Sequence, residues 1–406
     1  MQEVQFDLAR QETPAYVYDL KRVRTAHQRL TAALPSPTTL FYSLKANPHP
    51  AVLRQLAQLG CRAEVSSPGE LMAALHAGFH ADTVFYTGPG KRDADLHNAV
   101  AAGVRWFSLD SPAAFDQLEN VARLHAQPLS ALLRVNPPQR PRGAGLAMTG
   151  GVSQFGVEPS HVRDRPGSFA DRPHVRLAGL HLYLGSNMAR EDALITVFEY
   201  TLDVAEEIQT ALGRRLPVLD LGGGFGAPYA TRGDLPTFAT LKRRLETLFD
   251  RKLSGWRTGQ QRVAFESGRY LTATCGTLLA RVLDVKTSQG QRIVVLDSGV
   301  HHLGGMSGLG KEHRVEPELV TERDPGELNE YLVAGPLCHP LDSWSGSAKL
   351  PGIHIGDLVA VPNVGAYGLH SSLALFHGHQ LPVEVVVDGE TELERTRMSV
   401  RREPLE

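Results

Sequence analysis

The chain has 406 residues, of which 42% are hydrophobic and 21% are charged. This balance is typical of a globular protein with a sizeable core and excludes wholesale disorder. At roughly 150 residues per domain, the length fits two or three domains, or one large α/β barrel with a smaller domain. The formal net charge is −2, from 42 basic and 44 acidic side chains. Because no basic block stands out, we expect no nucleic-acid partner.

Targeting and metal-binding signals are weak. No run approaches the length of about 18 apolar residues that a membrane span needs, so no membrane partner is expected. The N-terminal stretch mixes charges and lacks the apolar core of a signal peptide. The three cysteines, Cys61, Cys275 and Cys338, have neither the spacing of a zinc site nor that of a disulfide framework. We therefore expect a soluble, cytoplasmic protein without a metal ion.

Eight β-type runs alternate with mostly amphipathic segments over the first two thirds of the chain. One such segment, 69–77, follows Pro68 and includes Glu70 early, and both residues favour a helix start. Eight strands with intervening helices match a (β/α)8 TIM-like barrel, with a doubly wound open sheet as the alternative. The predicted strands lie at 40–44, 62–66, 83–87, 105–109, 129–135, 176–184, 216–221 and 261–265.

The sequence pattern changes in the remaining third of the chain. Short β-branched runs, separated by glycine, proline and aspartate, predict an all-β domain there. The segment 14–19 is also strand-like and is a candidate to join that sheet, whereas 137–151 is a long loop rich in glycine and proline. We therefore predict an N-terminal strand region 1–20, a barrel 21–265 and a C-terminal β domain 266–406. The strands of that domain are expected at 277–285, 291–297, 356–361 and 381–387.

Lys45 directly follows the first predicted barrel strand. Barrel active sites lie at the carboxyl ends of the strands, so this side chain is placed to project into one. A lysine that is partly desolvated there has a lowered pKa and becomes an amine nucleophile for a carbonyl. On position alone, an ordinary surface lysine is the simpler interpretation.

A glycine run, Gly222-Gly223-Gly224, follows the seventh predicted strand, and the eighth ends in Glu266-Ser267-Gly268-Arg269. Consecutive glycines let backbone N–H groups converge on an anion. Barrels commonly bind phosphate at the loops after strands seven and eight. Taken singly, the run is a tight turn, and Glu266 with Arg269 is a surface ion pair. Together with a lysine nucleophile, the two segments indicate pyridoxal phosphate, with Glu266 beside its pyridine nitrogen.

The order of motifs along the chain resembles that of the fold-type III pyridoxal-phosphate decarboxylases, the group of diaminopimelate, ornithine and arginine decarboxylases. The resemblance covers nearly the whole length. Its motifs are Tyr42-Ser43-Leu44-Lys45-Ala46-Asn47, Glu64-Val65-Ser66-Ser67-Pro68-Gly69-Glu70-Leu71, Ser153-Gln154-Phe155-Gly156, the glycine run, Glu266-Ser267-Gly268-Arg269, Gly335-Pro336-Leu337-Cys338 and Gly365-Ala366-Tyr367.

This resemblance implies roles for individual residues. Lys45 resembles the lysine that forms a Schiff base with the cofactor, and Glu266 resembles its pyridinium partner. Cys338 resembles the cysteine that enters the neighbouring subunit's active site and protonates the substrate carbon, which implies a homodimer with composite sites. Taken alone, all three cysteines would be inert buried thiols. Further cofactor contacts are expected from His181, Tyr183, Ser186, Gly222, Gly223, Gly224, Gly268, Arg269 and Tyr367, and substrate contacts from His339, Asp342, Tyr367 and Phe376.

The chain departs from the family pattern at two places. Tyr183 stands where the family has a histidine that stacks on the cofactor ring, and an aromatic face still stacks there. His181, two residues earlier, either lines the site or packs. The second departure is His339, directly after Cys338, where amine-handling relatives carry an acid that grips the substrate's distal ammonium; Asp342 follows three positions later.

Decarboxylation of an amino acid or a conjugated amino acid, such as a carrier-protein-bound one from a siderophore or other secondary-metabolite pathway, is the predicted function. Two alternatives remain. An alanine-racemase-like enzyme would pair the pyridine nitrogen with arginine, which Glu266 and the motif ending in Cys338 disfavour. A non-catalytic cofactor-binding or regulatory protein would lose cofactor-binding residues, but Lys45 and Glu266 are both present.

Overall fold

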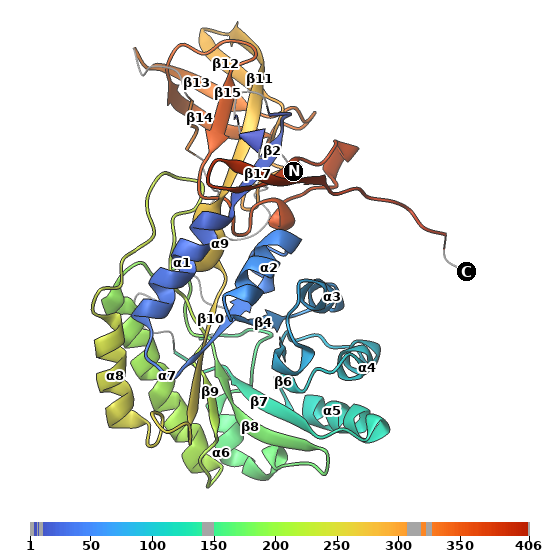
Figure 1. The fold of residues 1–406 in the computed structure, drawn as a ribbon, viewed down its shortest axis with the longest axis vertical. Coiled ribbons are helices and arrows are strands. Elements are labelled where there is room, and N and C mark those ends of the chain that lie inside the picture. The colour runs from blue at the N-terminus through green and yellow to red at the C-terminus, as the bar shows by residue number, and fades with distance from the viewer. Residues whose placement is uncertain are drawn as a thin grey trace. The chain divides into compact units, whose positions relative to one another are not determined.

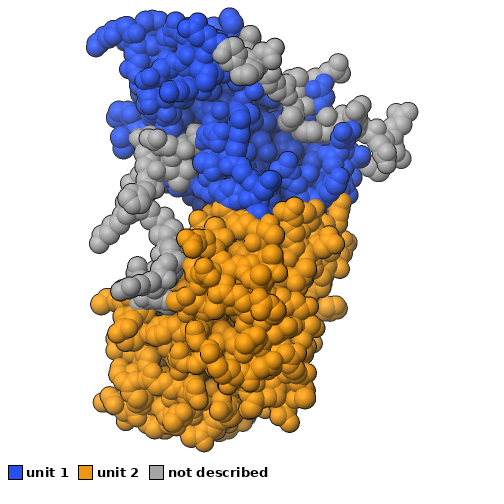
Figure 2. All heavy atoms as spheres, turned by 90° about the vertical axis from the view of Figure 1, so that its left-hand side faces the viewer, with its two compact units in different colours: residues 1–23, 228–235, 272–406 blue, residues 24–227, 236–271 orange. Residues whose placement is uncertain are grey.

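The computed structural model of the protein describes residues 4–5, 7, 11–139, 150–306, 318–321 and 327–404, so most of the predicted loop 137–151 lies outside the described residues. The chain forms two compact units, coloured separately in Figure 2. One comprises residues 24–227 and 236–271, and the other comprises 1–23, 228–235 and 272–406. The described residues contain no helix long and apolar enough to cross a membrane.

The first unit is built on a closed barrel of eight parallel strands (Figure 1). The last strand pairs with the first, with Glu266 opposite Phe41, so the sheet has no open edge. The prediction of a (β/α)8 barrel is confirmed, and the open sheet is wrong. Its strands are β3 (Thr39–Ser43), β4 (Arg62–Val65), β5 (Phe85–Tyr86), β6 (Trp106–Leu109), β7 (Leu129–Val135), β8 (Val175–Leu182), β9 (Val218–Asp220) and β10 (Arg262–Ser267).

Helices follow most of the strands, and local signals fix their starts. The Ser67 hydroxyl accepts a hydrogen bond from the Glu70 N–H at 3.2 Å and caps the third helix, which Pro68 begins. Leu71 and Ala74 then bury its inner face. The helices are α1 (Leu20–Ala33), α2 (Pro50–Gln58), α3 (Pro68–His76), α4 (Asp93–Ala101), α5 (Pro112–His125), α6 (Pro159–Asp164), α7 (Glu191–Ala211), α8 (Leu241–Lys252) and α9 (Arg269–Thr272).

The second unit is a mixed β-sheet assembled from both ends of the chain. Strand β2 pairs with β11 and with β16, so the strand-like N-terminal segment lies inside this sheet. Its small core includes Val17, Leu279 and Val385. The strands are β1 (Val4–Gln5), β2 (Ala15–Asp19), β11 (Gly276–Ser288), β12 (Gln291–Leu296), β13 (Asn329–Ala334), β14 (Ser343–Leu350), β15 (Leu358–Val361), β16 (Val383–Asp388) and β17 (Thr391–Arg397).

Candidate active site

Lys45 lies in a short turn, Leu44–Ala46, directly after β3. Its Nζ is 3.6 Å from Oε2 of Glu64, a buried residue of the neighbouring strand β4. The Thr87 hydroxyl donates a 2.5 Å hydrogen bond to the other Glu64 oxygen and fixes this carboxylate. Lys45 is thus held at the carboxyl end of the barrel strands, where the sequence predicted it. Glu64 was not singled out by the sequence analysis, although an acid inside an apolar strand is a signal for a paired buried charge.

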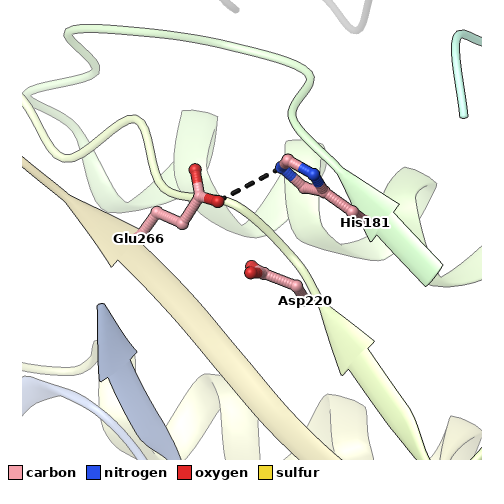
Figure 3. A group of neighbouring side chains, drawn as sticks. All are labelled: His181, Asp220 and Glu266. Carbon is pink, nitrogen blue, oxygen red and sulfur yellow. Dashed lines mark ion pairs between the residues drawn. The ribbon is translucent and has the colours of Figure 1, made fainter. Parts of the chain in front are cut away.

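Glu266 is buried on β10, and its Oε1 lies 3.2 Å from Nε2 of His181 (Figure 3). Burial alone raises the pKa of Glu266, but the nearby His181, Lys45 and Arg134 outweigh it and lower that pKa to about 2. The carboxylate is therefore charged at neutral pH. Oε1 has no well-aligned hydrogen-bond donor among the described residues. A buried, charged acceptor of this kind fits the N–H of a protonated pyridine ring.

Asp220 ends β9 beside Glu266 and was missed by the sequence analysis, although it directly precedes the glycine run. Its Oδ1 accepts the Gly222 N–H at 2.9 Å, while Oδ2 has no hydrogen-bond partner among the described residues. Burial and then the charge of Glu266 raise the pKa of Asp220 well above its usual range. Polar atoms of the two carboxyl groups lie within 4.8 Å of one another, so the pair favours holding one proton, and the directions of the two pKa shifts favour Asp220 as its carrier.

The glycine run is packed against its neighbours so closely that no side chain fits. A Cβ on Gly223 would lie 1.8 Å from the Glu266 carbonyl oxygen, and one on Gly224 would lie 2.4 Å from that of Gly185. Gly224 also has φ +92°, a left-handed conformation. The Gly222 carbonyl accepts the Glu266 N–H at 2.7 Å, which ties the run to β10. The run therefore keeps its backbone beside the Glu266 strand, as a phosphate-binding loop there requires.

The remaining barrel residues lie around this loop. The Tyr183 hydroxyl is 2.8 Å from the Ser186 hydroxyl, and the Tyr183 ring borders Gly222. His181 is buried, and its Nε2 lies 3.2 Å from Glu266 Oε1. Gly268 lies against the Lys45 turn, since a Cβ there would be 2.7 Å from the Ala46 Cβ. Arg269 begins α9 directly after it.

The other predicted site residues belong to the β unit. Cys338 is exposed, so the expectation of an inert buried thiol is wrong for this cysteine and confirmed for Cys61 and Cys275. Burial raises the pKa of the Cys61 thiol to about 12. The exposed His339 ring lies 5.7 Å from the Phe376 ring in an edge-on contact. Tyr367 is half-buried with φ +58°, and its carbonyl accepts the Tyr229 hydroxyl at 2.9 Å.

Asp342 differs from its neighbours because it is buried. One carboxylate oxygen accepts the Val300 N–H and the other accepts the Leu337 N–H, both at 2.8 Å. The Asp342 carboxylate therefore stabilises the loop that carries Cys338 and His339.

Comparisons with known proteins identify one family of enzymes. A family model described as pyridoxal-dependent decarboxylase, pyridoxal binding domain, matches residues 20–273. L-glutamyl-[BtrI acyl-carrier protein] decarboxylase of Niallia circulans is 32% identical, with 95% of this chain and 91% of that protein covered. Diaminopimelate decarboxylase of Methanothermobacter thermautotrophicus is also 32% identical, with 95% and 89% covered.

Solved structures show the same fold. Diaminopimelate decarboxylase of Helicobacter pylori, complexed with L-lysine, superposes with a TM-score of 0.81 at 23% identity, covering 96% of this chain and 94% of that one. Lysine/ornithine decarboxylase of Vibrio vulnificus, complexed with putrescine, gives a TM-score of 0.76 at 24% identity, covering 92% and 94%. The chain belongs to the pyridoxal-dependent decarboxylase family, and it is a pyridoxal-phosphate-dependent amino-acid decarboxylase.

Proposed function

We propose that this decarboxylase acts on an amino acid whose far end is acylated or attached to a carrier protein, rather than on a free basic amino acid. The observation that carries the proposal is His339, the exposed residue directly after Cys338. A buried ammonium group needs a paired carboxylate, and leaving it unpaired costs several kcal/mol. An imidazole supplies no such carboxylate. It donates a hydrogen bond, and when protonated it favours an acyl oxygen or an anion.

The state of Asp342 supports this proposal. It is the nearest acid after Cys338 along the chain, and it would be the alternative partner for an ammonium group. Both of its oxygens already accept backbone N–H groups, from Val300 and Leu337. Turning this carboxylate toward a substrate would break two charge-assisted hydrogen bonds inside the protein, at a cost of roughly 1.5–3 kcal/mol each. We therefore assign Asp342 to the loop and His339, with Phe376, to the substrate's far end.

The relatives include one enzyme with a conjugated substrate beside several diaminopimelate decarboxylases. One relative that is 32% identical over nearly the whole chain is an L-glutamyl-[acyl-carrier protein] decarboxylase. A carrier-bound glutamyl group presents an acyl function where ornithine or lysine presents an ammonium. We place the enzyme in secondary-metabolite biosynthesis on this basis, with siderophore precursors among the candidate products.

The chemistry divides among a few residues. Pyridoxal phosphate, when bound, supplies the electron sink that accepts the electron pair left behind by CO2. Lys45 would bind the cofactor's aldehyde carbon through its neutral amine, and Glu64 Oε2 lies 3.6 Å from that nitrogen. Glu266 would accept the hydrogen bond of the protonated pyridine nitrogen. Glycines 222–224, Gly268 and Arg269 would hold the phosphate, and Tyr183, whose hydroxyl lies 2.8 Å from that of Ser186, would stack on the ring. Cys338 would supply the proton for Cα.

A homodimer with composite sites completes the proposal. Cys338 and His339 are exposed on their own unit, as residues that serve another chain's site must be. In a two-fold dimer each chain lends and receives the same loop, so two equivalent sites form.

Carbon dioxide release tests the substrate class. Glutamate linked to pantetheine or to a carrier protein should be turned over, whereas free ornithine, lysine and diaminopimelate should be poor substrates. The matched variant His339→Asp restores an acid and should shift preference toward the free diamino acids. A kcat/KM of about 10⁴ M⁻¹s⁻¹ or more for a free basic amino acid with the unaltered enzyme would overturn the proposal.

A further inference from the structure

Three consecutive barrel strands, β8, β9 and β10, bring His181, Asp220 and Glu266 together (Figure 3). One polar atom of each lies within 4.8 Å of the others. All three side chains are buried, so water does not screen their interactions. The charge on each of these side chains therefore strongly affects the pKa values of the other two. None of the roles described above explains why His181 is part of this group.

Both nitrogens of the His181 ring face a polar neighbour, although the Nε2 contact with Glu266 is close without being an aligned hydrogen bond. Nδ1 lies 2.8 Å from the hydroxyl of Ser108 on β6, and Nε2 lies 3.2 Å from Glu266 Oε1. The Phe85 ring packs at a centroid distance of 5.3 Å and restricts the imidazole further. Because Ser108 reaches one end of the ring and Glu266 the other, the ring's orientation is fixed, and with it the direction in which Nε2 meets the carboxylate.

We propose that His181, anchored by Ser108, is a positioning residue that fixes the Glu266 carboxylate and keeps it charged, while Asp220 retains the proton. The inference rests on the proposed role of Glu266 as the partner of the pyridine nitrogen. It concerns how this chain prepares that carboxylate before any substrate arrives.

The charged groups around Glu266 support the proposal that Glu266 is ionised while Asp220 is protonated. The groups that face it are His181, Asp220, Lys45 and Arg134, the last a buried residue of β7. Two adjacent buried carboxylates cannot both be charged cheaply, so one of them keeps a proton. The pKa shifts of the pair agree: burial raises that of Asp220 well above its usual range, and that of Glu266 is lowered to about 2 despite its burial.

A cavity lies next to Asp220 inside the barrel. It lies at the amino-terminal ends of the barrel strands, where Thr39, Arg62 and Arg262 begin β3, β4 and β10, and Asp220 is among its lining residues. Its volume is about 40 Å³, and the Asp220 side chain itself is fully buried.

The first experiment uses the cofactor-free protein. Glutamate labelled with ¹³C at the side-chain carboxyl reports the ionisation of Glu266 by NMR, with Glu266→Gln identifying its signal. In the unaltered protein the carboxylate should stay charged down to low pH. His181→Leu should move its titration upward, and His181→Gln, whose amide still donates a hydrogen bond, should move it less. The matched control His49→Gln changes another buried barrel histidine, which caps α2, and should leave the signal in place. An unmoved titration in His181→Leu overturns the proposal.

The second experiment uses the holoenzyme. His181→Leu should weaken cofactor binding and lower kcat by about 10-fold to 100-fold, the effect of losing one buried contact with a charged group, with KM little changed. Ser108→Ala should give a smaller loss of the same kind. In a Glu266→Gln background, His181→Leu should add nothing, because the histidine acts through the carboxylate. An equal loss in both backgrounds would mean that His181 is only a packing residue.

The two experiments separate this inference from the proposed function. If Glu266 does not serve the pyridine nitrogen, Glu266→Gln alone leaves the visible spectrum of the bound cofactor unchanged, while the NMR titration still shows the coupling to His181. If His181 does not position Glu266, the titration is unmoved whatever the cofactor does.

Discussion

The Asp342 carboxylate accepts the Leu337 N–H at 2.8 Å, one residue before Cys338. Its other oxygen accepts the Val300 N–H, so the same side chain joins two segments of the β unit. The space around it is shaped for this contact, because a Cβ on Gly335 would lie 2.3 Å from Asp342 Oδ2. The loop that presents Cys338 is therefore held by a buried acid rather than by a regular strand.

Replacing this acid should loosen the loop. Asp342→Asn exchanges a charged acceptor for an amide whose NH₂ faces one of the two N–H donors, so about 2 kcal/mol of stability should be lost. We expect kcat to fall while the cofactor's visible spectrum stays unchanged. Denaturant unfolding and steady-state kinetics check this, with the exposed Glu390→Gln as a control that should change neither. A change in substrate preference without loss of stability would show instead that Asp342 faces the substrate.

A second lysine allows a sharp test of the covalent site. The Lys91 side chain is 7% exposed and donates to the carbonyls of Gly88 and Ser108, whereas Lys45 is 36% exposed. Burial lowers the pKa of Lys91 to about 8, so its amine is intrinsically reactive but enclosed. Borohydride reduction and peptide mapping should find the cofactor on Lys45. Lys45→Ala should abolish both the imine absorbance and turnover; a cofactor adduct on Lys91 in the unaltered enzyme would contradict the assignment.

The β unit carries an acid that links stability to pH. Glu384 on β16 is buried, 3.3 Å from the Tyr18 hydroxyl, and burial raises its pKa to about 7. Between the unfolded pKa of about 4.5 and this value, the folded chain holds a proton that the unfolded chain has released. The contribution of Glu384 to stability is therefore fully present below pH 4.5 and falls as pH rises toward 7, by up to about 3 kcal/mol.

Chemical unfolding at pH 5 and pH 8 measures this effect. Glu384→Gln removes the titrating proton, so the stability difference between the two pH values should shrink relative to the unaltered protein. The Tyr18→Phe variant keeps the carboxyl group and removes the hydrogen bond, so it should retain the pH dependence. An identical pH dependence in Glu384→Gln and the unaltered protein would contradict the assignment.

The sequence predicted the barrel well because its strands are short apolar runs with clear glycine and proline boundaries. It was weaker where strands are polar. Strand β17, with the sequence Thr-Glu-Leu-Glu-Arg-Thr-Arg, lies largely exposed and carries no apolar stripe. Strand β14, with the sequence Ser-Trp-Ser-Gly-Ser-Ala-Lys-Leu, buries only Trp344 and Leu350, so its apolar face is short, and neither strand was predicted. Strand β5 proved shorter than its run because Ala81–Thr83 forms a 3₁₀ turn before it.

The order of the motifs along the chain located Lys45 and Glu266. It could not predict which side chains of neighbouring strands contact each other. Glu64 meets Lys45 because β4 pairs with β3, and His181 meets Glu266 because β9 pairs with both β8 and β10. Asp220 carried one local signal, an acid between apolar residues and a glycine run. Asp342 was predicted to contact the substrate because it follows Cys338 closely in the sequence. Its hydrogen bonds with the Val300 and Leu337 N–H groups depend on how the loop folds, which the sequence does not reveal.

The dimer prediction can be tested by complementation. Lys45→Ala and Cys338→Ala homodimers should each be inactive or strongly impaired. Random exchange of subunits makes half of the dimers mixed, and in a mixed dimer one of the two sites receives both intact residues. About a quarter of the original activity should therefore return, measured as CO2 release after exchange has been verified with differently tagged chains. Exchange without any recovery would mean that Cys338 serves its own chain's site or that protonation of Cα does not need it.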